Sequence, residues 1–215
     1  MQKGDRTLTL REVHRIAITG ASYKGGTTLA TNIRNAIGPK CGLIDISIPT
    51  LVARSIGRHK ADEVMPNVSD HQFVTLAQAK IMAFNIQVYL EDEMREKYEY
   101  TVSHRCSLDM AAHHLQQIPP NSHDKDLIAR AIEHADFYDL IIFCPIFSGV
   151  IEDNQIRSTI REDLLGVQEN IRILIDQNDL WDKTVHMSNN KPTDSRERIG
   201  ELISLMAAKG MRLPE

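Results

Sequence analysis

The chain has 215 residues, 42% of them hydrophobic and 25% charged, with a formal net charge of -4. These values fit a globular protein and predict a single domain over residues 1–215. The net negative charge argues against a surface built broadly on nucleic-acid backbone. No apolar run approaches the roughly 18 residues of a membrane helix, and the N-terminus lacks a signal-peptide core, so we expect neither membrane insertion nor secretion.

The first predicted elements flank a glycine-rich stretch. Residues 1–12 are polar and predict a lead-in arm or a short extra strand. Residues 13–19 form a near-continuous apolar run, which is typical of a strand buried on both faces of a parallel sheet. Leu29, Ile33, Ala36 and Ile37 then recur at helical spacing, and Gly38-Pro39 ends this predicted helix.

The remaining elements continue the alternation of strands with helices. Strands are predicted at 41–46, 100–103, 139–144 and 184–187, and helices at 50–56, 70–98, 110–118, 124–135, 162–175 and 194–209. We expect the acidic end of the long helix, residues 91–97, to be a solvated face. This order predicts an α/β fold with a parallel sheet covered on both faces.

The stretch between the first strand and the first helix, residues 20–28, has the context of a phosphate-binding loop. Glycines allow consecutive backbone N–H groups to converge, and the helix directs its positive dipole end at the same point. Against the template G-x-x-x-x-G-K-[ST], Gly20, Gly25 and Thr27 match, but Gly26 stands at the lysine position. Lys24 is the nearest lysine. A tight packing turn is the alternative interpretation.

Ligands of open parallel sheets bind at the carboxyl ends of the strands, where this chain has several polar residues. Asp45 follows the second strand, and His104 and Arg105 follow the third. Arginines begin at Arg157 after the fourth strand, and Asn189 follows the last one. Cys41, Cys106 and Cys144 lack metal or redox spacing, which predicts reduced core thiols and a cytoplasmic protein. No histidine has a partner at zinc-ligand spacing.

Four segments together resemble the P-loop nucleoside and nucleotide kinases, within them the ribosylnicotinamide-kinase-like family of AAA-type ATP-binding domains. Residues 102–112 are similar to the family's strand ending in Asp-Arg, followed by a Leu-x-Asp step into a helix. Residues 152–161 look like its lid, and residues 49–54 resemble its Glu-x-x-Arg segment. Residues 191–199 are similar to the terminal loop beside the adenine. The resemblance covers about residues 13–209.

The resemblance implies a three-layer fold with a five-stranded, mostly parallel sheet and a small lid at about 150–162. It implies ATP and Mg²⁺ as cofactors and a nucleoside, nucleotide or related small molecule as acceptor. The predicted phosphate-binding residues are Gly20, Ser22, Lys24, Gly25, Gly26, Thr27, Thr28 and Asn189. The predicted catalytic residues are Lys24, Asp45, Arg105, Arg157 and Arg161. Thr27 would offer its hydroxyl to Mg²⁺, and His104 is a further candidate metal ligand.

Three departures fall on working positions of the family. Gly26 replaces the lysine that would bridge the β and γ phosphates. His104 stands where the resemblance predicts a metal-organising or catalytic aspartate, and Leu51 where it predicts a glutamate. Lys24 lies in the same loop, and its flexible ammonium is a candidate substitute for the lysine.

Each candidate residue also has a purely structural interpretation. Asp45 is either a general base or a strand-end turn former. Arg105 fits a phosphate or carboxylate clamp, or a surface ion pair. Arg157 and Arg161 either approach the transferring phosphate or lie on a solvated helix face. His104 either binds a metal, acts as a base or only forms a hydrogen bond.

Three functions remain open at this point. The first is an ATP-dependent phosphotransferase acting on a nucleoside or nucleotide. The second is a nucleotide-binding or regulatory protein that kept the fold and lost turnover. The third is a kinase of modified bases in DNA, which the net charge disfavours. The sequence decides neither between ATP and GTP nor between a monomer and a homodimer.

Overall fold

The computed structural model describes residues 11–21, 25–45, 70–120, 124–146, 161–189 and 195–214, with backbone only at 70–77, 161 and 195. The strands are β1 (Arg11–Glu12), β2 (Arg15–Thr19), β3 (Cys41–Ile44), β4 (Tyr100–His104), β5 (Leu140–Phe143), β6 (Thr184–His186) and β7 (Met211–Arg212). The helices are α1 (Gly26–Ile37), α3 (Asp70–Lys97), α4 (Ser107–Gln117), α5 (Lys125–Ala135), α6 (Arg161–Gln177) and α7 (Ser195–Ala208), with a 3₁₀ turn, η2, at Leu180–Lys183.

Five strands form one fully parallel sheet in the order β3-β4-β2-β5-β6. The short strands β1 and β7 pair separately in a two-stranded parallel sheet. β2 therefore lies in the centre, and the chain crosses over it between β4 and β5. The predicted five-stranded α/β sheet is confirmed, and all of its described ladders are parallel.

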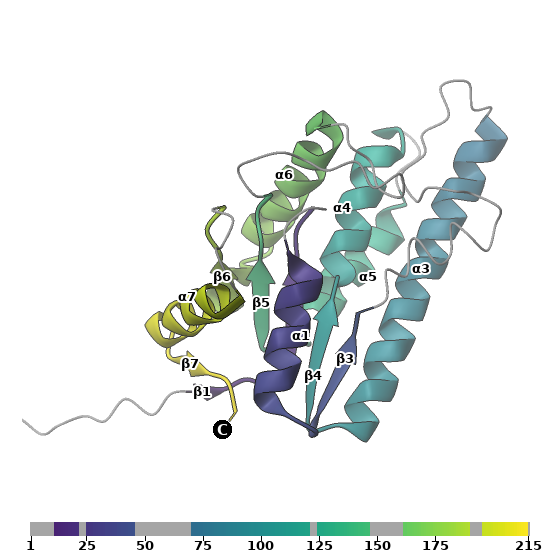
Figure 1. Cartoon of the computed structure of the whole chain (residues 1–215). Helices are drawn as coiled ribbons and strands as arrows, with labels where there is room; N and C mark the ends of the chain where they lie inside the picture. The colour runs from purple at the N-terminus through teal and green to yellow at the C-terminus, as the bar shows by residue number, and fades with distance from the viewer. Residues whose placement is uncertain are drawn as a thin grey trace, which may run out of the picture.

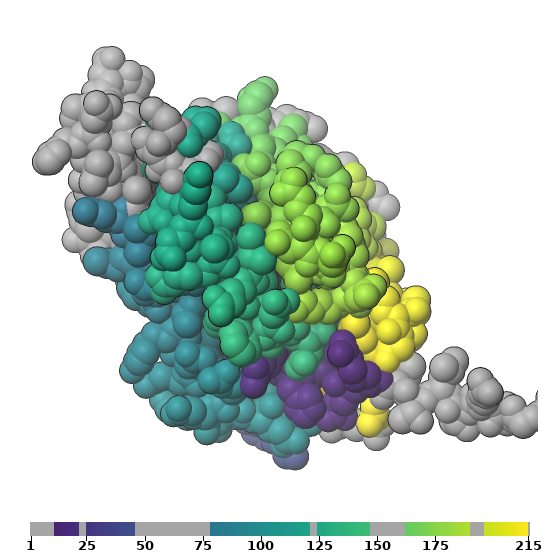
Figure 2. Space-filling model, turned by 180° about the vertical axis from the view of Figure 1, so that it is seen from behind, coloured from purple at the N-terminus to yellow at the C-terminus, as the bar shows by residue number. Residues whose placement is uncertain are grey.

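Two apolar layers sandwich the sheet because successive side chains of a buried strand point to opposite faces. Ile16 and Ile18 of β2 pack with α1 and α7, whereas Ala17 packs on the opposite face with α3, α4, α5 and α6. Figure 1 shows this three-layer arrangement. Figure 2, seen from behind, shows side chains of α3, α5 and α6 covering the second face. The short apolar strands are thus buried on both faces.

The predicted helices agree with the described ones within a few residues, and the predicted helix at 50–56 lies outside the described residues. No described helix is both long and apolar enough to cross a membrane. The three cysteines are buried and none of them forms a disulfide, as predicted. The arrowheads of β4 and β5 in Figure 1 point to the end of the sheet at which α1 begins. This end carries the predicted site.

Candidate functional site

The glycine-rich loop joins the central strand β2 to α1. Gly25, the residue before α1, has a left-handed backbone with φ 69, and Gly20 has φ 132. Both conformations favour glycine, because a Cβ atom would clash there. The first backbone N–H groups of an α-helix have no partner within the helix, and the first turn of α1 carries no acidic side chain. This end of α1 is therefore suited to an anion. Ser22 and Lys24 lie outside the described residues.

His104 lies directly against the start of α1. It is the last residue of β4 and is 5% exposed, and its Nδ1 lies 3.3 Å from Thr27 Oγ1. The β2–β4 register pairs His104 with Ile18, whose side chain packs on the same face of the sheet as α1. The sequence predicted these two residues separately, and the structure brings them into contact. Their role as metal ligands stays a prediction.

Arg105 and Asp109 hold the other side of the loop. The Arg105 guanidinium donates from Nη1 to the carbonyl oxygen of Gly20 at 3.1 Å and to Asp109 Oδ1 at 3.2 Å. Asp109 is fully buried and also accepts from the backbone N–H groups of Gly20 and Cys106, at 3.3 and 2.9 Å. Arg105 thus clamps a carboxylate beneath the loop. The phosphate contact expected of Arg105 stays a prediction.

Asp109 is a residue whose role the sequence interpretation missed. The Leu-x-Asp step was noted as a family motif, but nothing in it indicated that the carboxylate would bind the backbone of Gly20, 89 positions earlier. The positive φ of 85 at Arg105 was equally hidden, because a non-glycine residue rarely adopts it. The backbone of Arg105 is fixed by its N–H bond to Ile18 and by Gln87, which donates to its carbonyl oxygen.

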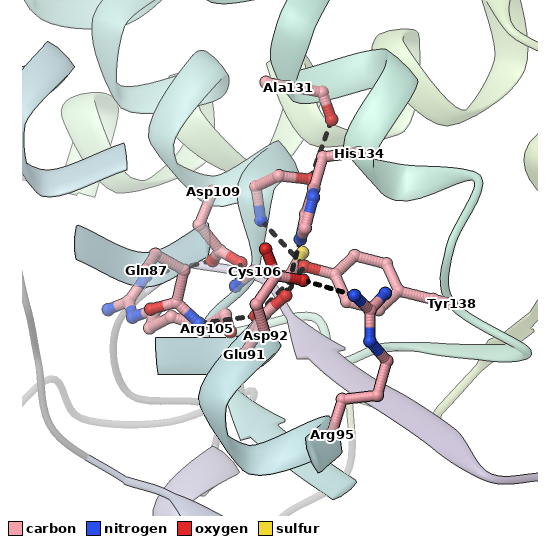
Figure 3. Close-up of polar contacts among 11 residues, drawn as sticks. Gln87, Glu91, Asp92, Arg95, Arg105, Cys106, Asp109, Ala131, His134 and Tyr138 are labelled. Atoms are coloured by element: carbon pink, nitrogen blue, oxygen red, sulfur yellow. Dashed lines mark hydrogen bonds and ion pairs between the residues drawn. The ribbon is translucent and has the colours of Figure 1, made fainter. Parts of the chain in front are cut away.

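A buried polar network extends from Arg105 to α3 and α5 (Figure 3). Gln87 donates to Glu91 at 2.6 Å, and Glu91 pairs with His134 at 2.7 Å. Glu91 also accepts from the Tyr138 hydroxyl, which in turn accepts from the Ser107 N–H at the start of α4. Burial, together with the Glu91 charge, raises the pKa of Tyr138 well above its usual value, so the phenol stays neutral.

The expectation that residues 91–97 form a solvated face is wrong at its first residue. Glu91 is only 9% exposed, whereas the later residues Arg95 and Lys97 are exposed. Glu91 lies one helical turn after Gln87 and therefore on the same side of α3, which faces Arg105, His134 and Tyr138. The paired donors of that side make a buried carboxylate tolerable.

Asp45 lies near His104 by strand register. β3 and β4 pair Ile44 with Ser103, so Asp45 and His104 are the next residues of neighbouring parallel strands. Asp45 and His104 therefore lie at the same end of the sheet, at the ends of neighbouring strands. Asp45 is exposed, as a general base would need, but its proposed role in catalysis stays a prediction.

The other predicted site residues are placed only in part. Asn189 is exposed in the segment after β6. Arg157, Leu51 and most of the predicted lid lie outside the described residues, and so do residues 49–54 and 191–194. Arg161 begins α6, but its side chain is not among those described. The structure thus brings together Gly20, Gly25, Thr27, His104 and Arg105.

The side chains around Thr27 suit Mg²⁺ poorly. Mg²⁺ prefers oxygen ligands and is usually held by one or two carboxylates plus phosphates, whereas the group next to the Thr27 hydroxyl is an imidazole. The buried carboxylate at the loop, Asp109, already accepts from two backbone N–H groups and from Arg105. Within the described segments there is no group of three or more His, Cys, Asp or Glu side chains that could hold a metal ion.

Comparisons with known proteins support the fold. No protein-family model matches the chain, and no curated protein matches it. Among solved structures, it is similar to the NadR protein in complex with NAD and AMP-PNP, with TM-score 0.60 and 12% identity over 96% of this chain. The chain spans about half of that protein, 51%.

Two further structures match over nearly their full length. A deoxyadenosine kinase from M. mycoides with bound dCMP and dCDP matches with TM-score 0.57 and 11% identity, over 90% of this chain and 99% of that one. A thymidylate kinase from Ehrlichia chaffeensis matches with TM-score 0.52 and 12% identity, over 91% and 95%. With its central β2, its glycine loop and its parallel sheet, the chain has the fold of the P-loop nucleoside and nucleotide kinases.

Proposed function

We propose that the chain is a nucleotide-binding protein on a kinase fold, which binds the phosphates of ATP at the loop between β2 and α1. One observation carries the proposal: the left-handed Gly25 directly precedes α1, in the loop that follows the carboxyl end of the central strand. The backbone N–H groups of the first turn and the helix dipole together supply a site for phosphate. Arg105 and Asp109 fix Gly20 at the base of the loop.

The described residues support binding better than they support turnover. Backbone N–H groups bind phosphate without a lysine, whereas phosphoryl transfer needs positioned cations to stabilise the transition-state charge. Gly26 stands at the lysine position, and the guanidinium of Arg105 is occupied with Gly20 and Asp109. Lys24, Arg157 and Arg161 remain the predicted cations. A protein that binds the nucleotide without turning it over is therefore the first candidate function.

A phosphotransferase acting on a nucleoside or nucleotide is the second candidate, and Asp45 is the observation that favours it. Its carboxylate follows β3 next to the position of His104, at the end of the sheet at which α1 begins. There it would accept the proton of an acceptor hydroxyl as the γ phosphate is transferred.

A mainly apolar groove of about 410 Å³ lies on α3. It contains none of the predicted phosphate-binding residues, so it is separate from the proposed nucleotide site.

Binding of a fluorescent ATP analogue to the full chain tests the first candidate. Gly25→Ala should weaken binding by about tenfold or more, because alanine strains the left-handed backbone that directs the N–H groups of the first turn of α1 toward the phosphates. Gly38→Ala is the matched control: Gly38 caps the other end of α1 with φ 89, and its Cβ atom would meet nothing within 4 Å. Equal binding by both variants, or no binding by the wild type, would contradict the proposal.

Turnover separates the two candidates. ATP consumption is measured with a panel of nucleosides and nucleotides, for the wild type, Lys24→Ala and Asp45→Asn. Binding without turnover on any acceptor supports the nucleotide-binding protein. Turnover that falls by about a hundredfold or more in Asp45→Asn supports the phosphotransferase with Asp45 as its base.

A further inference from the structure

His104 contacts the hydroxyl of Thr27, the group that the sequence predicts as a metal ligand. The imidazole nitrogen and the hydroxyl oxygen are 3.3 Å apart, within hydrogen-bond distance. His104 is the terminal residue of β4 and nearly fully buried, while Thr27 is fixed in the first turn of α1. Both groups are thus held by regular elements.

The two carboxylates near the loop are poorly placed to bring a hard cation to Thr27. Asp109 lies beneath Gly20 and would give up three hydrogen bonds, including that to the buried guanidinium of Arg105, if it turned to a metal. Asp45 follows the edge strand β3, and β4 with His104 lies between β3 and the strand that leads into the loop. Among the residues that the structure describes, the imidazole is therefore the side chain that reaches the hydroxyl.

We propose that His104 takes the place of the metal ion at Thr27, so that the loop binds the nucleotide phosphates without requiring a divalent cation. This inference rests on the proposed nucleotide-binding function. The phosphate charge is balanced by the backbone N–H groups and positive end of α1, neither of which needs a metal. The imidazole ring lies beside the hydroxyl, in contact with it, and Mg²⁺, whose coordination is strict in its geometry, prefers oxygen ligands to a ring nitrogen.

The test measures binding of a non-hydrolysable ATP analogue to the full chain by calorimetry, once with excess EDTA and once with excess Mg²⁺. The wild type should bind less than about fivefold more tightly with Mg²⁺ than with EDTA, a difference below about 1 kcal/mol. His104→Asp restores a carboxylate beside Thr27 and should gain a Mg²⁺ preference of about fivefold or more.

Three further variants separate a change in metal preference from misfolding and from a general effect on α1. His104→Asn keeps a hydrogen-bonding group at the same place but brings no carboxylate, so its binding should show no Mg²⁺ preference, whatever its affinity. Thr27→Ala should lower the Mg²⁺ preference of the His104→Asp background, whereas Thr31→Ala, one turn further along α1, should not. Far-UV circular dichroism checks that each variant is folded.

The outcomes separate the inference from the function. Wild-type binding that is about fivefold or more tighter with Mg²⁺, or with Mn²⁺, which accepts nitrogen ligands more readily, overturns the inference and leaves the function standing. Metal-independent binding by both the wild type and a folded His104→Asp overturns the assignment to His104. No nucleotide binding in any condition overturns the proposed function and the inference with it.

Discussion

Asp109 shows how one buried carboxylate can hold a loop in place. It has no exposed surface, and its oxygens accept from Gly20, Cys106 and Arg105. Asp109→Asn keeps the shape of the side chain but removes the negative charge that faces the buried Arg105 guanidinium. We expect the free energy of unfolding in urea to fall by about 3–5 kcal/mol, because removing one partner of a buried ion pair is strongly destabilising.

The matched control for Asp109 is Asp126→Asn. Asp126 forms the same kind of carboxylate–guanidinium pair, with Arg130 at 3.8 Å, but both side chains are exposed. Exposed pairs contribute about 0–1 kcal/mol, so this variant should unfold almost like the wild type. Equal losses of stability in the two variants would contradict the role assigned to Asp109.

The thiol of Cys41 should make the folded chain less stable at high pH. Burial raises the pKa of its thiol from 9.0 to about 11, against a smaller opposing effect of the charge of Arg34. As the pH rises above 9.0, the unfolded chain releases the thiol proton while the folded chain retains it, so stability is lost as the pH approaches 11. Relative to Cys41→Ala, the wild type should lose about 1 kcal/mol between about pH 8 and pH 10, measured by urea unfolding. If the difference in the free energy of unfolding between the wild type and Cys41→Ala did not change with pH, the raised pKa of the Cys41 thiol would be contradicted.

At the scale of elements, Tyr138 connects the start of α4 to α3. Its hydroxyl accepts from the Ser107 N–H and donates to Glu91. Tyr138→Phe leaves a buried N–H and a buried carboxylate each without one partner, and should lower the free energy of unfolding by about 1–3 kcal/mol. Tyr89→Phe is the control. Its hydroxyl also donates to a glutamate, Glu93, but the side chain is 61% exposed, so the change should be within about 0.5 kcal/mol.

Much of the fold could be predicted from local patterns. The run 139–144 predicted β5, since a parallel strand buried on both faces needs continuous apolar residues. The polar residues Arg11 and Glu12 gave no comparable signal for a pairing partner, and β1 pairs with β7, 200 positions later along the chain. Such pairings depend on the packing of the whole chain, which no local pattern encodes.

The parts of the candidate site that are recognisable from local sequence patterns could be predicted. The glycine loop and the positions of Asp45, His104 and Arg105 at strand ends followed from the spacing. The contact of Thr27 with His104 and the bond of Asp109 to Gly20 join residues 77 and 89 positions apart, so only the strand register reveals them. Glu91 was misjudged because an acidic run looks solvated until its inner face is known.

At the scale of the whole molecule, the two apolar layers share the same five strands. Ile16 and Ala17 are neighbours in β2 but belong to opposite layers, so neither layer can lose its packing without disturbing the sheet. We therefore expect the described α/β core to unfold in one cooperative transition. The midpoint reported by the fluorescence of Trp181, the single tryptophan, should coincide with that of far-UV circular dichroism, since Trp181 packs against the layer of α3 to α6.

The same unfolding experiment, repeated with ATP, tests whether the nucleotide binds at the proposed site. A ligand that binds only the folded chain stabilises it by about 2.7 kcal/mol at a hundred times its dissociation constant. If the site lies between β2 and α1, at the centre of the shared sheet, ATP should shift both midpoints by the same amount. Gly25→Ala, whose binding is weakened about tenfold or more, should reduce that stabilisation to about half or less at the same ATP concentration, and Gly38→Ala should retain it. A shift confined to one probe would place the nucleotide in a unit that unfolds separately, and would contradict a site built on the central strand.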